Sequence, residues 1–351
     1  MNIAVVVLNY RTETMTLDCL ASLQSEVEAL PGTHVFLVDN ASNDGSKERL
    51  ADEIRRRGWQ LWITLLDSEE NRGFSAGNNL AIRRILAGDA AEAQVPFQAL
   101  LLLNSDTIVR PGALSKLAES MSRDQHIGLI GPKLEWPDAT LQPSCFQNIS
   151  PLSEFLSAAK TGPVSRLFGS REAPLNGVDG ANDRDAIEWI SFACVLVRRE
   201  VFESVGLLDD KYFMYYEDVD YCRRARERGW KIAWEPAARV IHLRGGAVRE
   251  TFAAQERKRR PRYYYASRAR YLAKFYGRGG PCAANLLWWA GRSISLAREV
   301  GGRKPPHTAE REPVDIWTGC FRGAPPASDT IPGEKSRQPD NGQHTDHDDA
   351  G

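Results

Sequence analysis

The chain has 351 residues, enough for one large α/β domain or two smaller ones with a substantial core. Its 45 Lys and Arg residues against 46 Asp and Glu residues give a formal net charge of -1, which excludes a globally basic nucleic-acid-binding protein. The six cysteines form no CxxC pair, so the sequence indicates neither a zinc ribbon nor a disulfide framework, and we expect a protein of the reducing cytoplasm.

The first half of the chain alternates short apolar strands with helical patterns, which predicts βαβ units and a mainly parallel sheet. The predicted strands are 3–8, 35–38, 61–66, 99–103 and 127–130. The first follows the initial Met directly, without the features of a signal peptide, and no run of about 18 apolar residues predicts a transmembrane helix. Several strands end in polar clusters, at the edge where α/β sheets hold ligands.

The second half is less regular. Residues 141–185 have little periodicity and predict an irregular insertion. A strand is expected over 188–198, a helix over 217–228, and two short strands over 231–234 and 239–243. The last fifty residues, 302–351, contain seven of the 19 prolines and little apolar periodicity, which predicts a disordered tail.

Residues 249–278 contain ten Lys and Arg residues against two Glu, interleaved with aromatic residues. Such a segment suits nucleic-acid phosphates and bases, an anionic lipid surface with Trp288 and Trp289 at the interface, or a helical face that packs its tyrosines on the preceding domain. We favour contact with a membrane surface through 249–289 and expect no nucleic-acid partner.

Two polar loops follow predicted strands. The loop VDNASNDGS places Asp39 and free backbone N–H groups before a helix, which suits a nucleotide base, ribose or phosphate, or only caps that helix. The loop NRGFSAGNN combines Arg72, suited to a diphosphate, with glycines that allow close backbone approach. It matches neither GxGxxG nor GxxxxGK[ST], which disfavours dinucleotide-binding and P-loop chemistry.

Carboxylates gather at two further positions. The strand ending LLLNSD delivers Asp106 to its carboxyl end, where it suits a divalent cation that bridges a diphosphate, or caps a helix. In FMYYEDVDYCRR, three carboxylates open a helix, where the helix dipole stabilises them, and the flanking aromatic residues suit a carboxylate that accepts a proton. A lone histidine such as His242 is more often structural than a ligand.

These motifs, in this order, resemble the family 2 glycosyltransferases of the GT-A fold, and more narrowly their bacterial rhamnosyltransferase-like branch. The resemblance runs over residues 3–246 and rests on VVVLNYR, VDNASNDGS, NRGFSAGNN, LLLNSD and FMYYEDVDYCRR. It implies an α/β GT-A nucleotide-sugar-binding domain over 1–246, a basic, aromatic helical extension over 247–301, and the tail over 302–351.

The resemblance also assigns roles to residues. It implies Mg²⁺ or Mn²⁺ held by Asp106 and His242, which reverses the structural reading of His242, and a catalytic base at Asp218, with Glu217 as the second choice. The NSD sequence lacks the first Asp of the family's DxD motif. The residues implied on the nucleotide-sugar side are Asn9, Asp39, Asn71, Arg72, Gly73, Asn78 and Ser105, and those on the acceptor side are Trp189, Phe192 and Tyr216.

The implied activity is inverting transfer of a sugar, with rhamnose as a candidate, from a dTDP-, UDP- or GDP-sugar. The implied acceptor is a hydroxyl of a cell-surface glycan or a polyprenyl-linked precursor, at the inner face of the bacterial membrane. Phe192 stands where the family has a small residue, and it either narrows the acceptor pocket or fills the core. Together with the altered metal motif, it leaves a non-catalytic nucleotide-sugar-binding protein as the alternative.

Overall fold

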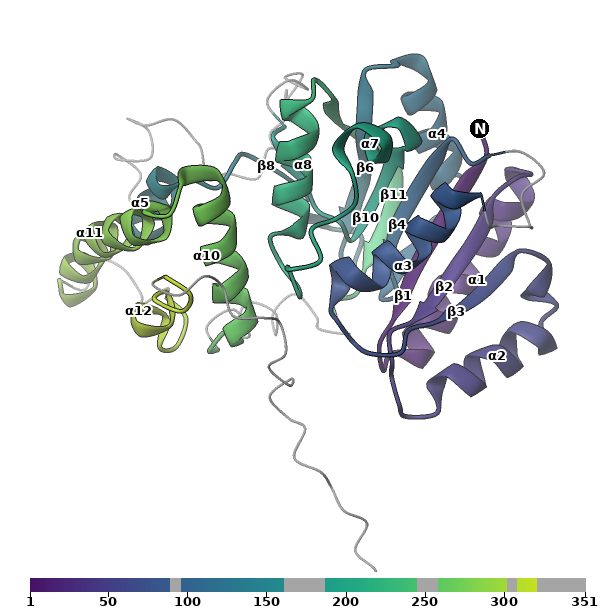
Figure 1. The fold of residues 1–351 in the computed structure, drawn as a ribbon, viewed down its shortest axis with the longest axis horizontal. Helices are drawn as coiled ribbons and strands as arrows, with labels where there is room; N and C mark the ends of the chain where they lie inside the picture. The colour runs from purple at the N-terminus through teal and green to yellow at the C-terminus, as the bar shows by residue number, and fades with distance from the viewer. Residues whose placement is uncertain (89–95, 161–186, 245–257, 302–307, 321–351) are drawn as a thin grey trace, which may run out of the picture.

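The computed structural model describes residues 1–88, 96–160, 187–244, 258–301 and 308–320 (Figure 1). Within these residues a nine-stranded sheet has the order β3-β2-β1-β4-β10-β6-β11-β5, with β7 added beside β6. Its strands are β1 (Ile3–Asn9), β2 (His34–Asp39), β3 (Ile63–Asp67), β4 (Ala99–Asn104), β5 (Thr107–Val109), β6 (Ile127–Glu135), β7 (Leu141–Gln142), β10 (Cys194–Arg198) and β11 (Lys231–His242). The predicted GT-A-like α/β architecture is confirmed.

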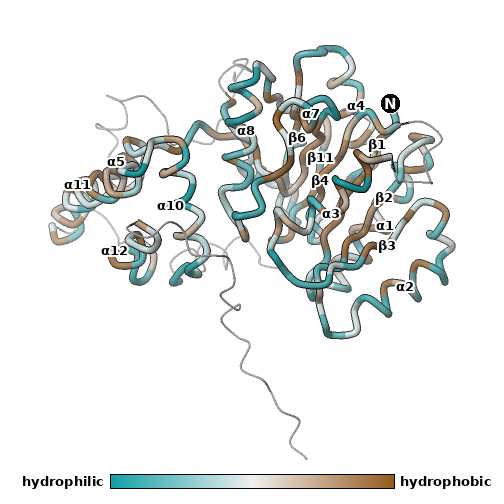
Figure 2. The backbone as a smooth tube through the Cα atoms, in the orientation of Figure 1, coloured by the Kyte–Doolittle hydropathy of each residue, from teal (hydrophilic) through white to brown (hydrophobic). Residues whose placement is uncertain are grey.

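Strands β3, β2, β1 and β4 run parallel, as predicted, and β2, β1 and β4 are buried on both faces. Alternate residues of β1 enter different cores: Val5 packs in the cluster that contains Leu20 of α1 (Glu13–Ala29), and Val6 packs in the cluster that contains Ile82 of α3 (Phe74–Ala87). Helices α2 (Ser46–Arg56) and α4 (Ala113–Arg123) complete this part. Figure 2 shows the central strands as predominantly hydrophobic.

The other half of the sheet is mixed. Strand β10 runs antiparallel to both β4 and β6, and β5 runs antiparallel to β11. The single strand predicted over 188–198 is wrong: β9 (Trp189–Ile190) pairs with β8 (Cys145–Phe146), and the chain turns before β10 enters the main sheet. The two strands predicted over 231–243 form one strand, β11, with a register shift where Pro236 interrupts the ladder.

Helices α7 (Arg199–Val205) and α8 (Glu217–Glu227) follow β10. In Figure 1 a second group of helices lies beside the sheet domain: α5 (Pro151–Ala159), α10 (Arg262–Tyr276), α11 (Gly280–Val300) and α12 (Glu312–Asp315). The predicted irregular insertion therefore contains an ordered helix, α5, which Ser150 and Ser153 cap reciprocally. Residues 161–186 lie outside the described residues.

The sequence predicts disorder over 302–351. This prediction is wrong for residues 308–320, which contain α12. Ile316 and Ala309 are buried there, so this segment has enough apolar contact to fold against the other helices. Residues 302–307 and 321–351 lie outside the described residues, as does 249–257 of the basic segment. In the part of the chain that the structure describes, no helix is both long enough and apolar enough to span a bilayer.

Candidate active site

Asp39 stands at the carboxyl end of β2 and is almost completely buried. Its Oδ1 accepts hydrogen bonds from Asn9 Nδ2 at 2.7 Å and from Ser42 Oγ at 2.6 Å, and its Oδ2 accepts from the Ser42 N–H at 3.1 Å. Asn9 is fully buried at the end of β1. The predicted pair Asn9 and Asp39 is therefore brought together, and it fixes the loop before α2.

The loop before α3 is shaped by its own residues. Asn71 Oδ1 accepts hydrogen bonds from Asn40 Nδ2 and from the Gly73 N–H, both at 2.9 Å. Arg72 extends outward, with 58% of its side chain exposed, and pairs with Glu70 at 3.5 Å. Arg72 also lies 3.9 Å from Asp210, so within this loop Arg72 is the predicted residue on the surface, whereas Asn71 orders the backbone.

Gly73 fastens this loop to the segment before α8. Its φ is +90°, and a Cβ built on it lies 2.1 Å from the carbonyl oxygen of Phe213. The next residue, Phe74, donates its N–H to that same oxygen at 2.7 Å. Asn78 is buried and donates to the Phe74 carbonyl at 2.9 Å, so it acts inside α3. The predicted nucleotide loop and the predicted catalytic segment thus share a backbone contact.

Asp106 and His242 are neighbours because β5 and β11 pair with Thr107 opposite His242. His242 Nε2 lies 3.5 Å from Asp106 Oδ1. On the other side of the ring, His242 Nδ1 lies 2.8 Å from Gln142 Oε1. The amide nitrogen of Gln142 donates to the His242 carbonyl at 3.2 Å, which identifies Oε1 as the acceptor from Nδ1–H. Gln142 therefore holds the His242 ring with Nε2 toward Asp106.

This pair fits a divalent cation. Two ligands of one Mg²⁺ or Mn²⁺ lie about 3 Å apart, close to the separation of Asp106 Oδ1 and His242 Nε2. Among the described residues no group of three or more His, Cys, Asp and Glu side chains gathers. Within the described part of the chain, this pair would supply two ligands, and a diphosphate and water suit the remaining positions. Ser105, beside Asp106, lies 3.0 Å from Thr12 through the two hydroxyl oxygens.

The start of α8 has an unusual backbone. Tyr215 and Tyr216 both have φ of +69°, a conformation that bulky residues rarely adopt. The Met214 carbonyl accepts a hydrogen bond from Ser267 Oγ of α10 at 3.0 Å. Together with the bond from Phe74, this contact holds the turn from both sides. Strain of this kind persists only where the surroundings fix it, and it often marks a functional site.

Glu217 and Asp218 begin α8 in a buried environment. Burial raises the pKa of Asp218 to about 6, against the opposing effect of the N–H groups of Val219 and Phe192 that donate to its carboxylate. Burial and the neighbouring charge of Asp218 raise the pKa of Glu217 well above its usual range. Glu217 Oε2 has no hydrogen-bond partner among the described residues. Asp218 is therefore a stronger base than an ordinary aspartate.

Helix α10 docks on this segment through its basic residues. Arg270 binds Asp209 with both Nη2 contacts below 3 Å, and Lys274 binds Asp209 at 3.1 Å and Asp220 at 2.5 Å. Tyr271 is buried against Tyr216. Of the three alternatives for the basic segment, packing of its tyrosines on the catalytic domain is the one observed for residues 262–276. Their cations serve that packing.

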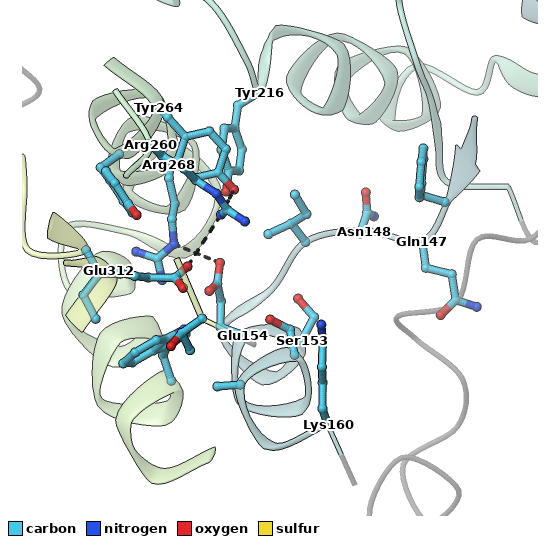
Figure 3. A pocket seen from close by; sticks show the side chains of 18 of the residues that line it. Gln147, Asn148, Ser153, Glu154, Lys160, Tyr216, Arg260, Tyr264, Arg268 and Glu312 are labelled. Carbon is cyan, nitrogen blue, oxygen red and sulfur yellow. Dashed lines mark hydrogen bonds and ion pairs between the residues drawn. The ribbon is translucent and has the colours of Figure 1, made fainter. Parts of the chain in front are cut away.

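A cavity of about 300 Å³ lies between α5, α10, α11, α12 and the start of α8 (Figure 3). Trp189 and Tyr216, both predicted on the acceptor side, line it. Arg268 pairs with Glu154 at 2.9 Å, and Arg260 with Glu312 at 3.5 Å (Figure 3). The lining also includes Tyr264, Tyr265, Trp288 and Phe146. The walls thus combine aromatic faces with charges that are already paired.

Two buried polar atoms belong to this cavity's lining residues. Tyr265 Oη and Arg268 Nη2 have no hydrogen-bond partner within the described part of the chain, although both residues are at least 97% buried. Phe192 does not line the cavity. It is buried in the core with its ring 6.0 Å from that of Tyr221, so it fills the core there.

The sequence profile described as "Glycosyltransferase like family 2" matches residues 1–266. The chain belongs to this family. This glycosyltransferase chain is 32% identical over 232 residues to the N-acetylglucosaminyl-diphospho-decaprenol L-rhamnosyltransferase of Mycobacterium tuberculosis. The match covers 64% of this chain and 70% of the relative. It is 24% identical over 245 residues to the dTDP-rhamnosyl transferase RfbF of Shigella flexneri, covering 70% of each. These relatives support the bacterial rhamnosyltransferase-like branch.

Solved structures support the fold of this glycosyltransferase. The mannosyltransferase PcManGT from Pyrobaculum calidifontis, solved with GDP-Man and Mn²⁺, superposes with a TM-score of 0.54 at 13% identity, covering 87% of this chain and 76% of that one. GalNAc-T7, solved with UDP, GalNAc and Mn²⁺, gives a TM-score of 0.52 at 15% identity, covering 93% and 58%. The protein is an inverting family 2 enzyme that uses a nucleotide-sugar donor.

Sequence reasoning missed several residues of the glycosyltransferase site. Gln142, which orients His242, lies in a two-residue strand and has no motif around it. Arg270 and Lys274 are four residues apart on a helix, a spacing that places them on one face, but the sequence does not show that their partner is Asp209. Arg268 was hidden in the same run of basic residues, although it is the one that is buried with Glu154.

Proposed function

We propose that this enzyme transfers rhamnose from dTDP-rhamnose to a hydroxyl of a lipid-linked glycan precursor, with Asp218 as the catalytic base. The observation that carries the proposal is the partly buried Asp218 carboxylate at the start of α8, beside buried Glu217, with a pKa of about 6 that leaves it ionised at neutral pH yet basic enough to accept a proton. The sugar and the acceptor type follow the names of the relatives from Mycobacterium tuberculosis and Shigella flexneri.

In the proposed step, the acceptor hydroxyl attacks the anomeric carbon as its proton passes to Asp218 Oδ. The bond between the anomeric carbon and the diphosphate oxygen breaks, and the nucleoside diphosphate leaves with that electron pair. The anomeric carbon passes through an oxocarbenium-like state, as in glycoside hydrolysis. The N–H groups of Val219 and Phe192 hold the carboxylate in place for this transfer.

Asp106 and His242 would hold Mg²⁺ or Mn²⁺ at the donor diphosphate. The bound cation would neutralise charge that develops on the leaving diphosphate. Arg72 is placed to add a second positive charge, since its side chain extends from the loop that contacts the segment before α8. Asn9 and Asp39 order the neighbouring loop for the base and ribose.

We infer that the cavity beside α8 receives the acceptor sugar. Its aromatic walls suit the apolar faces of sugar rings, and its Arg and Glu pairs suit hydroxyls, which both donate and accept hydrogen bonds. Tyr265 Oη and Arg268 Nη2, which have no hydrogen-bond partner among the described residues, belong to residues of its lining. Tyr216 connects this cavity to the base, because it immediately precedes Glu217 and Asp218.

The experiment is a donor panel of dTDP-, UDP- and GDP-sugars with Mg²⁺ or Mn²⁺, which measures release of nucleoside diphosphate. We expect turnover with dTDP-rhamnose, and a loss of at least roughly a hundredfold in Asp218→Asn with nucleotide affinity retained. Glu217→Gln is the matched variant, which changes the adjacent buried carboxylate. Full activity of Asp218→Asn removes it as the base, and no turnover with any donor and acceptor favours a binding protein.

A further inference from the structure

Helix α11 exposes an apolar face to solvent. Ten of its 21 residues are exposed, and nine of these ten are apolar. Six are large: Leu286, Leu287, Trp289, Ile294, Leu296 and Val300. The exposed fraction reaches 64% for Leu286 and 90% for Val300. The other exposed positions are three alanines and Ser293.

The buried face of α11 carries its polar residues. Asn285 and Ser295 are fully buried, and Arg292 is nearly so. Arg292 pairs with Glu299 through contacts of 2.5 and 2.9 Å, and Asn285 accepts from Arg268 at 2.8 Å. A helix on the surface of a water-soluble domain has the opposite arrangement, with its apolar stripe inward.

Small residues complete the inner face. A Cβ built on Gly291 lies 2.2 Å from the carbonyl oxygen of Phe155 in α5, so the two helices approach as closely as only glycine allows. The inner face of α11 is therefore occupied by α5 and its own polar network. The exposed apolar residues of α11 therefore do not pack in the core of the described chain. They need an apolar environment outside it.

Charge at the ends of this face favours one kind of environment. Arg278 is exposed just before α11, and Lys160 and Arg298 meet at the other end, where Arg298 Nη1 donates to the Lys160 carbonyl at 3.2 Å. The acidic residue of α11, Glu299, is engaged by Arg292 on the inner side. An apolar helical face with Trp, flanked by cations, suits the boundary between acyl chains and anionic headgroups.

We propose that α11 lies flat in the interfacial plane of an anionic bilayer, with the face of Leu286, Trp289, Leu296 and Val300 inserted. α11 is at the end of the molecule remote from the sheet, where a flat surface can reach it (Figure 1). The membrane contact predicted through 249–289 is thus assigned to a different helix: α10 faces the catalytic domain, and α11 faces the lipid. The benefit to catalysis rests on the proposed lipid-linked acceptor, because Trp288, next to Trp289, lines the acceptor cavity.

The test is flotation of the full chain with phosphatidylcholine vesicles, with and without phosphatidylglycerol. We expect binding to the anionic vesicles, reduced at least roughly tenfold by the double variant Leu286→Glu and Leu296→Glu. Leu61→Glu is the matched control for Leu286→Glu alone, since Leu61 is 85% exposed on the sheet domain and each change adds one negative charge. Circular dichroism and nucleotide binding establish that each variant is folded.

Three outcomes overturn the proposal. They are no flotation of the unmodified chain, equal flotation of the double variant, and a stable dimer in solution that the double variant splits while vesicles are not bound. Donor hydrolysis is measured on the same protein preparations before vesicles are added. Because hydrolysis reports on the proposed enzyme and flotation reports on α11, failure of either is recognised separately.

Discussion

His242 Nε2 faces Asp106 Oδ1 across 3.5 Å, while the opposite ring nitrogen is held by Gln142 Oε1 at 2.8 Å. The two residues are 136 positions apart in the chain, and the antiparallel pairing of β5 with β11 brings them together. Gln142 comes from a third strand, β7, and its amide also binds the His242 backbone. The orientation of the His242 ring toward Asp106 is thus fixed at the edge of the sheet.

Gln142→Leu tests this arrangement without touching the two ligands. The variant removes the acceptor for Nδ1–H, so the imidazole loses its fixed tautomer and orientation. We expect Mn²⁺ affinity in the presence of a nucleoside diphosphate to fall about 10- to 100-fold, measured by calorimetric titration. Gln24→Leu is the control, because Gln24 of α1 accepts a hydrogen bond from Trp59 at 3.3 Å and is not among the contacts of His242. Unchanged Mn²⁺ affinity in Gln142→Leu would show that Gln142 does not orient the ligand.

The pH dependence of transfer follows from the raised pKa of Asp218. A base must be ionised, so the protonated form that accumulates below about pH 6 is inactive. We expect kcat to rise with pH through about 6 and then to level off, with dTDP binding flat over the same range. The measurement is a pH series of initial rates with saturating donor and acceptor. A rate that is constant down to pH 5 contradicts the role of Asp218.

Tyr265→Phe probes the acceptor cavity with the smallest possible change. The hydroxyl has no hydrogen-bond partner among the described residues, so its removal leaves the fold intact. If a sugar hydroxyl binds it, we expect the acceptor KM to rise roughly tenfold, with donor hydrolysis unchanged. Tyr221→Phe is the control, because the hydroxyl of Tyr221 donates to the Gly206 carbonyl at 2.9 Å and neither residue lines the cavity. An unchanged KM in Tyr265→Phe places the acceptor elsewhere.

Much of the sheet domain is predictable from the sequence because its signals are local. The apolar runs around Val5 and Leu101 are buried on both faces, and the loops at Asp39 and Asn71 follow strands where polar residues interrupt these runs. The order of motifs also places Asp106 and Asp218 at the ends of elements that the structure confirms. Family resemblance, rather than spacing, pointed to His242.

The remainder depends on contacts that are distant in the sequence. The reach of Arg268 to Glu154 spans 114 residues, and no local pattern distinguishes it from the exposed arginines around it. The inverted polarity of α11 has a similar cause: Asn285, Arg292 and Ser295 resemble a solvent-facing set in the sequence, but contacts with residues distant in the chain bury them. The role of Phe192 stays open in the sequence because its burial depends on contact with Tyr221 of α8, which is distant in the chain.

Gly73→Ala tests the contact between the nucleotide loop and the segment that leads to Asp218. An added Cβ would lie 2.1 Å from the Phe213 carbonyl oxygen, and the residue has φ of +90°. Since backbone cannot yield as a flexible side chain does, the loop or residues 213–216 must shift, and the Phe74 bond to Phe213 is lost. We expect a fall in stability of about 2 kcal/mol or more and a large loss of kcat.

Gly88→Ala separates this steric effect from the cost of the left-handed backbone. Gly88 ends α3 with φ of +75°, and in the described chain a Cβ there meets nothing within 4 Å. Its substitution should cost about 1 kcal/mol in thermal or denaturant unfolding and leave kcat intact, because the strain is confined to a helix end far along α3 from the loop. If Gly73→Ala behaves like Gly88→Ala in both measurements, the contact with Phe213 does not position the base. A kcat loss confined to Gly73→Ala, with donor affinity retained, locates the defect at the turn of Tyr215 and Tyr216 that presents Asp218.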